Sequence, residues 1–146
     1  MIQEQKELLL KDLCSRSPYG VKCTVYEDAG VQTLSGVLPN NIYNELYFGE
    51  LDWKECNGFA NVQYCKPYLF PLSSMTEAQK NELSEMEWSF DNSTICNIVE
   101  CFGTYRAYVD HSCCSELIDW FHKNHFDYRG LIPMGLALDA TGKNIY

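Results

Sequence analysis

The chain has 146 residues, of which 46% are hydrophobic and 14% aromatic. This length and composition predict a single domain over residues 1–146, large enough to bury a core without metal or disulfide support. Twenty acidic residues against eleven basic ones give a formal charge of −9. A net negative charge repels phosphate and anionic lipid, so direct binding to nucleic acid or to a membrane surface is disfavoured.

The negative charge is concentrated in two stretches, 27–55 and 77–100. Each stretch holds six carboxylates and one lysine. The simplest interpretation is two solvated surfaces that keep a small protein in solution. The same pattern also suits a surface that meets a basic partner, or one that imitates DNA and inhibits a DNA-binding protein.

The sequence contains no segment typical of export or of membrane insertion. Its first residues lack a basic region followed by an apolar one, and no stretch approaches 18 uninterrupted apolar residues. We therefore expect a cytosolic protein. In that compartment its eight cysteines would be thiols, most of them serving as small apolar core residues.

The first half of the chain reads as one helix followed by short strands. Helical spacing of apolar residues predicts a helix over 2–14, which ends before a polar, proline-containing break. Alternating residues predict a hairpin of strands at 21–25 and 31–38, and further strands at 42–48 and 59–64. Short connections favour an antiparallel, strongly twisted sheet that could curl into a small barrel.

The second half reads as an extended segment and two helices. Two prolines in 66–71 predict an extended strap between layers. Thr76 and Gln79 have the spacing of a capping box at the start of a helix whose Leu83 faces the core. A further helix is predicted over about 112–124. The fold class is therefore α+β, with a curled antiparallel sheet packed against about three helices.

Three polar residues directly after the last helix are the candidate catalytic residues: His125, Asp127 and Arg129. Asp127 could accept hydrogen bonds from the backbone of the turn and pair with Arg129. The structural interpretation, a turn that satisfies its own polar groups, is the preferred one. The alternative is a small metal-dependent or acid/base enzyme that uses these side chains.

His122, His125 and Asp119 are the candidate metal ligands. They lie three residues apart at the end of the predicted helix, where such neighbours can share a face, and imidazoles with a carboxylate can bind a metal or move a proton. The simpler interpretation is a surface pair of Asp119 and His122, with His125 continuing the apolar stripe of the helix.

A second group that could bind metal contains four cysteines and one histidine. Its spacing does not match the close paired ligands of structural zinc sites, and adjacent residues on a helix point in different directions. We therefore expect no metal or other cofactor. The group comprises Cys96, Cys101, His111, Cys113 and Cys114.

Two segments carry a resemblance to a known group of proteins. They are KPYLFPLSSMTE at 66–77 and HFDYRGLIP at 125–133. With these segments the chain resembles small uncharacterised proteins encoded by phages and prophages of gut anaerobic bacteria. The resemblance implies a biological setting, and it implies no activity, because none is established for the group.

These observations lead to one main hypothesis and two alternatives. The main hypothesis is a non-enzymatic accessory protein of a phage or mobile element, acting in the bacterial cytoplasm by binding another protein or by self-association. The first alternative is the small enzyme that uses the segment around Asp127. The second is the acidic DNA-mimic inhibitor.

Overall fold

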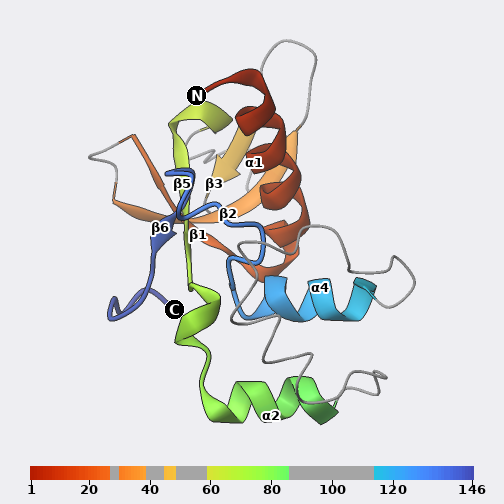
Figure 1. The fold of residues 1–146 in the computed structure, drawn as a ribbon. Helices are drawn as coiled ribbons and strands as arrows, with labels where there is room; N and C mark the ends of the chain where they lie inside the picture. The colour runs from red at the N-terminus through yellow and green to blue at the C-terminus, as the bar shows by residue number, and fades with distance from the viewer. Residues whose placement is uncertain (27–29, 39–44, 49–58, 86–113) are drawn as a thin grey trace.

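The protein combines α-helices with one mixed sheet, so the α+β class is confirmed. The computed structural model describes residues 1–26, 30–38, 45–48, 59–85 and 114–146. Within these residues the elements are α1 (Gln3–Arg16), β1 (Lys22–Val25), β2 (Val31–Leu38), β3 (Glu45–Phe48), β4 (Phe59–Asn61), β5 (Cys65–Leu69), α2 (Glu77–Glu85), α4 (Cys114–Lys123) and β6 (Leu138–Asp139) (Figure 1).

The six described strands form one open sheet in the order β4-β3-β2-β1-β5-β6. Neighbours from β4 to β5 are antiparallel, as expected. A register shift between Leu34 and Gly36 bends β2, but the strand order has two edges and is not closed into a barrel. The sequence-based expectation of purely antiparallel pairing was wrong at one edge, where β6 pairs with β5 in parallel.

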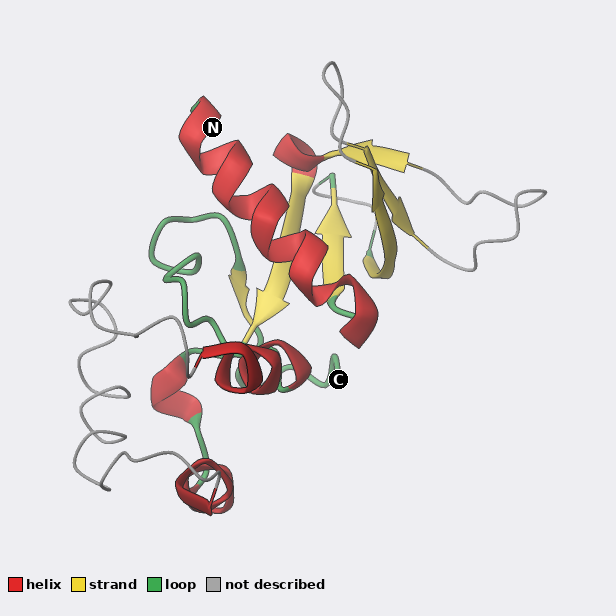
Figure 2. Ribbon diagram, turned by 90° about the vertical axis from the view of Figure 1, so that its right-hand side faces the viewer, coloured by secondary structure: helices red, strands yellow, loops and turns green. Residues whose placement is uncertain are grey.

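Helix α1 covers one face of this sheet (Figure 2). Leu9 and Leu13 lie four residues apart on one side of the helix and are fully buried against the strands. The helix continues to Arg16, two residues beyond the predicted end, and a 3-10 turn at Ser17–Tyr19 follows it. Gly20 then adopts a left-handed conformation with φ of 65°, which glycine accepts without steric cost.

The proline-containing segment is a strand of the sheet rather than a strap between layers. β5 lies between β1 and β6, and Pro67 pairs with Cys23. Because the backbone N–H of Tyr26 donates to the carbonyl of Tyr64, the alternation of an antiparallel ladder places Pro67 at a position without hydrogen bonds to β1. Its missing N–H therefore costs the β1–β5 pairing nothing.

Helix α2 begins with the predicted capping box. The side chain of Gln79 accepts a hydrogen bond of 2.9 Å from the backbone N–H of Thr76, and the Thr76 hydroxyl accepts one of 3.3 Å from the N–H of Gln79. Leu83 is buried, as expected. The helix is described to Glu85, and the rest of its predicted apolar stripe lies outside the described residues.

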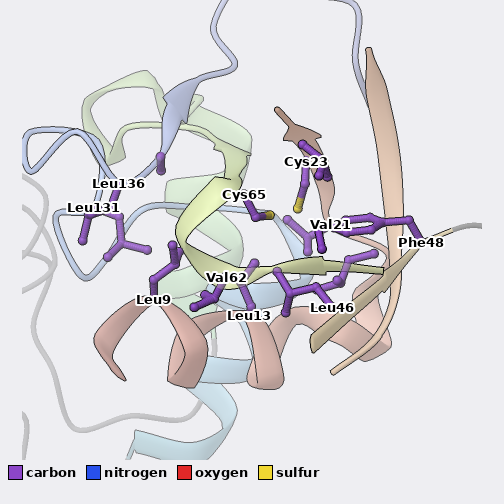
Figure 3. Close-up of a cluster of buried hydrophobic side chains, with 14 of the residues drawn as sticks. Leu9, Leu13, Val21, Cys23, Leu46, Phe48, Val62, Cys65, Leu131 and Leu136 are labelled. Atoms are coloured by element: carbon purple, nitrogen blue, oxygen red, sulfur yellow. The ribbon is translucent and has the colours of Figure 1, made fainter. Parts of the chain in front are cut away.

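Two clusters of buried apolar side chains hold these elements together. The larger lies between α1 and the sheet, and Figure 3 shows Leu9, Leu13, Val21 and the thiols of Cys23 and Cys65 within it. The smaller joins α2 and the residues before it to α4 and the segment after α4. Its members are Leu72, Met75, Leu83, Trp120, Phe121 and Phe126.

Candidate functional site

The predicted catalytic residues follow the end of α4, which has the hydrogen bonds of a Schellman motif. The N–H of Phe126 donates to the carbonyl of Phe121, and the N–H of His125 donates to that of His122. His125 occupies the left-handed position of this motif, with φ of 57°, where glycine is usual. Its conformation is therefore set by the helix end.

The His125 ring lies flat on Tyr146, with ring centroids 3.9 Å apart and planes 14° apart. Its Nδ1 is buried and has no hydrogen-bond partner among the residues that the structure describes. Burial, reinforced by the positive charge of Arg16, lowers the pKa of His125 to about 4. His125 is thus a neutral packing residue at neutral pH.

His122 is buried, so the predicted surface pair with Asp119 does not form. Only 2% of its surface is exposed, whereas Asp119 is exposed to solvent. Its Nε2 lies 2.9 Å from the hydroxyl of Tyr128, and burial, followed by the charge of Arg16, lowers its pKa to about 4. The amphipathic pattern of α4 misled the prediction because the segment after the helix folds back over its polar side.

The candidate metal ligands are not arranged around one point. No group of three or more His, Cys, Asp or Glu side chains in the described ranges could hold a metal ion. Of the cysteine and histidine group, Cys96, Cys101, His111 and Cys113 lie outside the described residues, and Cys114 begins α4.

The carboxylate of Asp127 is directed into its own turn. Its two oxygens accept hydrogen bonds of 2.7 and 2.8 Å from the backbone N–H groups of Leu131 and Ile132. Burial raises the pKa of this carboxyl, and the two hydrogen bonds oppose that rise. The predicted bonds to the turn backbone are therefore present, and both oxygens are engaged.

Arg129 does not pair with Asp127. Its Nε instead donates a 3.0 Å hydrogen bond to Asp12 in α1. The other oxygen of Asp12 accepts a 2.6 Å bond from Nε of Arg16, and neither Asp12 nor Arg16 is exposed. One buried carboxylate therefore joins two arginines from opposite ends of the chain.

This network was not predicted, although the sequence contains a signal for it. Asp12 and Arg16 are four residues apart and alternate with Leu9 and Leu13 on the same side of α1. Charged residues within a buried stripe are rarely unpaired. The pattern predicts the pair within the helix, but Arg129 is 117 residues away and no local rule indicates it.

The three candidate catalytic residues thus have separate partners. His125 stacks on Tyr146, Asp127 holds its turn, and Arg129 reaches α1. A catalytic constellation needs an acid, a base or a nucleophile directed at one point. These three side chains instead stabilise the C-terminal segment: His125 and Asp127 make contacts within it, and Arg129 attaches it to α1.

A different set of side chains gathers on the sheet face that points away from α1. Residues of β1 and β5 alternate between the buried core, which includes Leu9 and Leu13 of α1, and this face. We call it the tyrosine–lysine face. It comprises Tyr26, Tyr64, Tyr68, Lys22, Lys66 and Lys143.

Tyr26 and Tyr64 form the most exposed part of this face. Their rings stack with centroids 5.0 Å apart and planes 28° apart, yet 54% of Tyr26 and 49% of Tyr64 remain exposed. Val31, which begins β2, is 49% exposed and pairs with Thr24 of β1. An apolar, aromatic surface therefore lies open at one end of the sheet.

The backbone of Tyr26 is in the left-handed region, with φ of 50°. For a residue other than glycine this conformation costs about 1–2 kcal/mol. The N–H of Tyr26 is held by the carbonyl of Tyr64 at 3.0 Å. Residues kept in such conformations cluster at binding and catalytic sites.

Comparison with known proteins adds no family to these observations. We find no match to this chain among protein-family models, curated proteins or solved structures. Among the helices that the structure describes, none is long and apolar enough to cross a membrane. The candidate site therefore rests on geometry alone.

Proposed function

We propose that the protein is a non-enzymatic binding module that engages another protein through the tyrosine–lysine face. Its setting would be the bacterial cytoplasm, as an accessory protein of a phage or mobile element, in line with the resemblance in the segments at 66–77 and 125–133. The polar residues after α4 then serve stability, and the sheet face serves recognition.

The exposed stack of Tyr26 on Tyr64 carries this proposal. Two large rings that stay half exposed leave apolar area in water, which a partner could bury. Tyrosine is enriched at protein interfaces because it offers a large contact area and a hydroxyl at little cost in conformational entropy. The left-handed backbone of Tyr26 further favours a role beyond folding.

The test is affinity capture from the native bacterial host, comparing wild type with the Tyr26→Ser/Tyr64→Ser variant. A stoichiometric protein partner that binds wild type and is lost with this variant is the expected result. Leu38→Ser is the matched control, since Leu38 is 51% exposed and lies seven residues along β2 from Val31, about 23 Å in an extended strand. A partner retained by the double variant would overturn the proposal.

A further inference from the structure

The lysines of the tyrosine–lysine face form no ion pair within the described part of the chain. Asp139 is a carboxylate that acts on one of them, and its pKa is lowered mainly by the backbone N–H of Thr141 and to a smaller extent by the charge of Lys143. The Nζ of Lys22 donates to the hydroxyl of Thr33 at 2.6 Å, and that of Lys143 lies 5.1 Å from the ring centre of Tyr68. Lys66 is exposed.

Positive charge on this face is opposite in sign to the protein as a whole, which carries −9. The exposed carboxylates of the helices lie elsewhere, on α1, α2 and α4. Charges of one sign gathered on one face of an oppositely charged protein steer a complementary partner to that face. The exposed carboxylates in question are Glu4, Glu7, Glu77, Glu82, Glu85, Glu116 and Asp119.

We infer that the tyrosine–lysine face binds an extended, acidic segment of a partner protein. This inference rests on the proposed function and specifies the chemistry of the partner. An apolar or aromatic residue of the segment packs on Tyr26 and Tyr64, while its carboxylates meet Lys22, Lys66 and Lys143.

The dimensions of the face suit such a segment. Tyr26 directly follows β1 and lies four positions along the chain from Lys22, about 13 Å in an extended strand. Lys66 lies between them, because it pairs with Thr24 across the β1–β5 ladder. About four residues of extended peptide therefore span the face from its aromatic end to its basic end.

A peptide suits this face better than a nucleic acid. A nucleic-acid strand carries a phosphate at every nucleotide, and a protein with a net charge of −9 repels the phosphates that lie beyond the three lysines. A short acidic segment can place its few carboxylates against the lysines alone, within a Debye length of about 8 Å.

The test is selection of a random heptapeptide library on the purified full chain, with counter-selection on the Tyr26→Ser/Tyr64→Ser variant. We expect enriched peptides to combine Asp or Glu with one aromatic or large apolar residue. The affinity of an enriched, fluorescein-labelled peptide is then measured by anisotropy. Lys66→Glu/Lys143→Glu should weaken it by at least about tenfold, as expected when charge pairs are reversed.

Lys11→Glu/Lys123→Glu is the matched control, since it makes the same change of charge at exposed positions on α1 and α4 and should leave the affinity unchanged. Enriched peptides that need the tyrosines but carry no acidic residues would overturn this inference and leave the proposed function standing. If no peptide prefers wild type to the tyrosine variant, the inferred acidic partner and the proposed function are both wrong. Tighter binding of labelled oligo(dT) than of the acidic peptides would replace the inferred partner by single-stranded nucleic acid.

Discussion

Arg16 donates a hydrogen bond of 2.7 Å from Nη2 to the backbone carbonyl of Phe126. Its Nη1 lies 3.5 Å from the carbonyl of Phe121, so a guanidinium of α1 caps the C-terminal end of α4. Carbonyls at a helix end carry partial negative charge and favour a cation there. The carboxylate of Asp12 is opposite in charge to Arg16 and accepts a bond from its Nε. Buried polar contacts of Arg16 therefore join α1 to the C-terminal segment.

Removing this guanidinium should be strongly destabilising. In Arg16→Met the carboxylate of Asp12 keeps only its bond to Arg129 and stays buried, and breaking a buried pair typically costs about 3–5 kcal/mol. The free energy of unfolding in urea measures the loss. Lys11→Met, at an exposed neighbouring position, is the control and should change stability by less than about 0.5 kcal/mol. A loss below about 1 kcal/mol for Arg16→Met would contradict the structural role.

The contrast between local and distant contacts marks what the sequence could predict. The capping box of Thr76 and Gln79 was found because it depends on residues three apart. The pairing of β1 with β2 was predicted because the alternation of residues along each strand is a local pattern. The parallel pairing of Tyr68 with Leu138 was missed because no short-range pattern specifies a partner 70 residues away.

The candidate site shows the same limit. The turn of Asp127 could be anticipated, because an acidic side chain a few residues before free N–H groups is a local arrangement. Pairing of Arg129 with Asp12, by contrast, depends on how the chain ends meet. The tyrosine–lysine face joins β1, β5 and Lys143, so it also becomes visible only in three dimensions.

Asp127→Asn should destabilise the C-terminal segment. An amide group keeps one acceptor oxygen, so one of the two backbone N–H groups of Leu131 and Ile132 loses its partner, at a cost of about 1–3 kcal/mol. Urea unfolding of Asp127→Asn against Asp139→Asn measures the effect. Asp139 is exposed and accepts one backbone bond from Thr141, so its variant should lose much less. Equal losses of unfolding free energy in the two variants would show that the buried turn of Asp127 adds no more to stability than the exposed turn of Asp139.

Stability should fall as the pH is lowered from about 7 to about 4. Burial holds the pKa values of His122 and His125 at about 4, against 6.5 for a free imidazole. Between these values the unfolded chain binds more protons than the folded one, so protonation favours unfolding. The raised pKa of Asp127 acts in the opposite direction, in the range where carboxyl groups titrate.

The measurement is urea unfolding at several pH values for wild type and His125→Asn. Asparagine accepts the left-handed backbone at this position and removes one of the two buried imidazoles. The variant should therefore show a shallower dependence of stability on pH, whatever its stability at pH 7. Parallel curves would mean that His125 does not contribute to the pH dependence.

Tyr146→Phe should weaken the attachment of the C-terminal residues. The Tyr146 hydroxyl accepts a 3.1 Å bond from the N–H of Lys22 and donates a 2.7 Å bond to the carbonyl of Tyr68. It thus bridges β1 and β5 where the two strands do not bond directly. The variant keeps the ring that stacks on His125. The free energy of unfolding in urea should therefore fall by about 1–2 kcal/mol, which is the contribution of the two hydrogen bonds alone. Unchanged stability would contradict the bridge.

Two substitutions at Tyr26 distinguish its effect on stability from its effect on binding. Tyr26→Gly and Tyr26→Ala both remove the ring that stacks on Tyr64, but only glycine relieves the left-handed backbone at φ of 50°. The glycine variant should therefore be the more stable of the two by about 1 kcal/mol in urea. Because the partner is proposed to contact the ring, both variants should lose binding to the same extent.

Equal stability of the two Tyr26 variants would mean that the backbone conformation carries no strain. Binding retained by Tyr26→Gly but lost by Tyr26→Ala would mean that backbone shape, rather than the ring, is recognised. Wild-type stability in the glycine variant together with lost binding is the decisive combination. It would show that Tyr26 is kept in a costly conformation for recognition, since folding alone would be served as well by glycine.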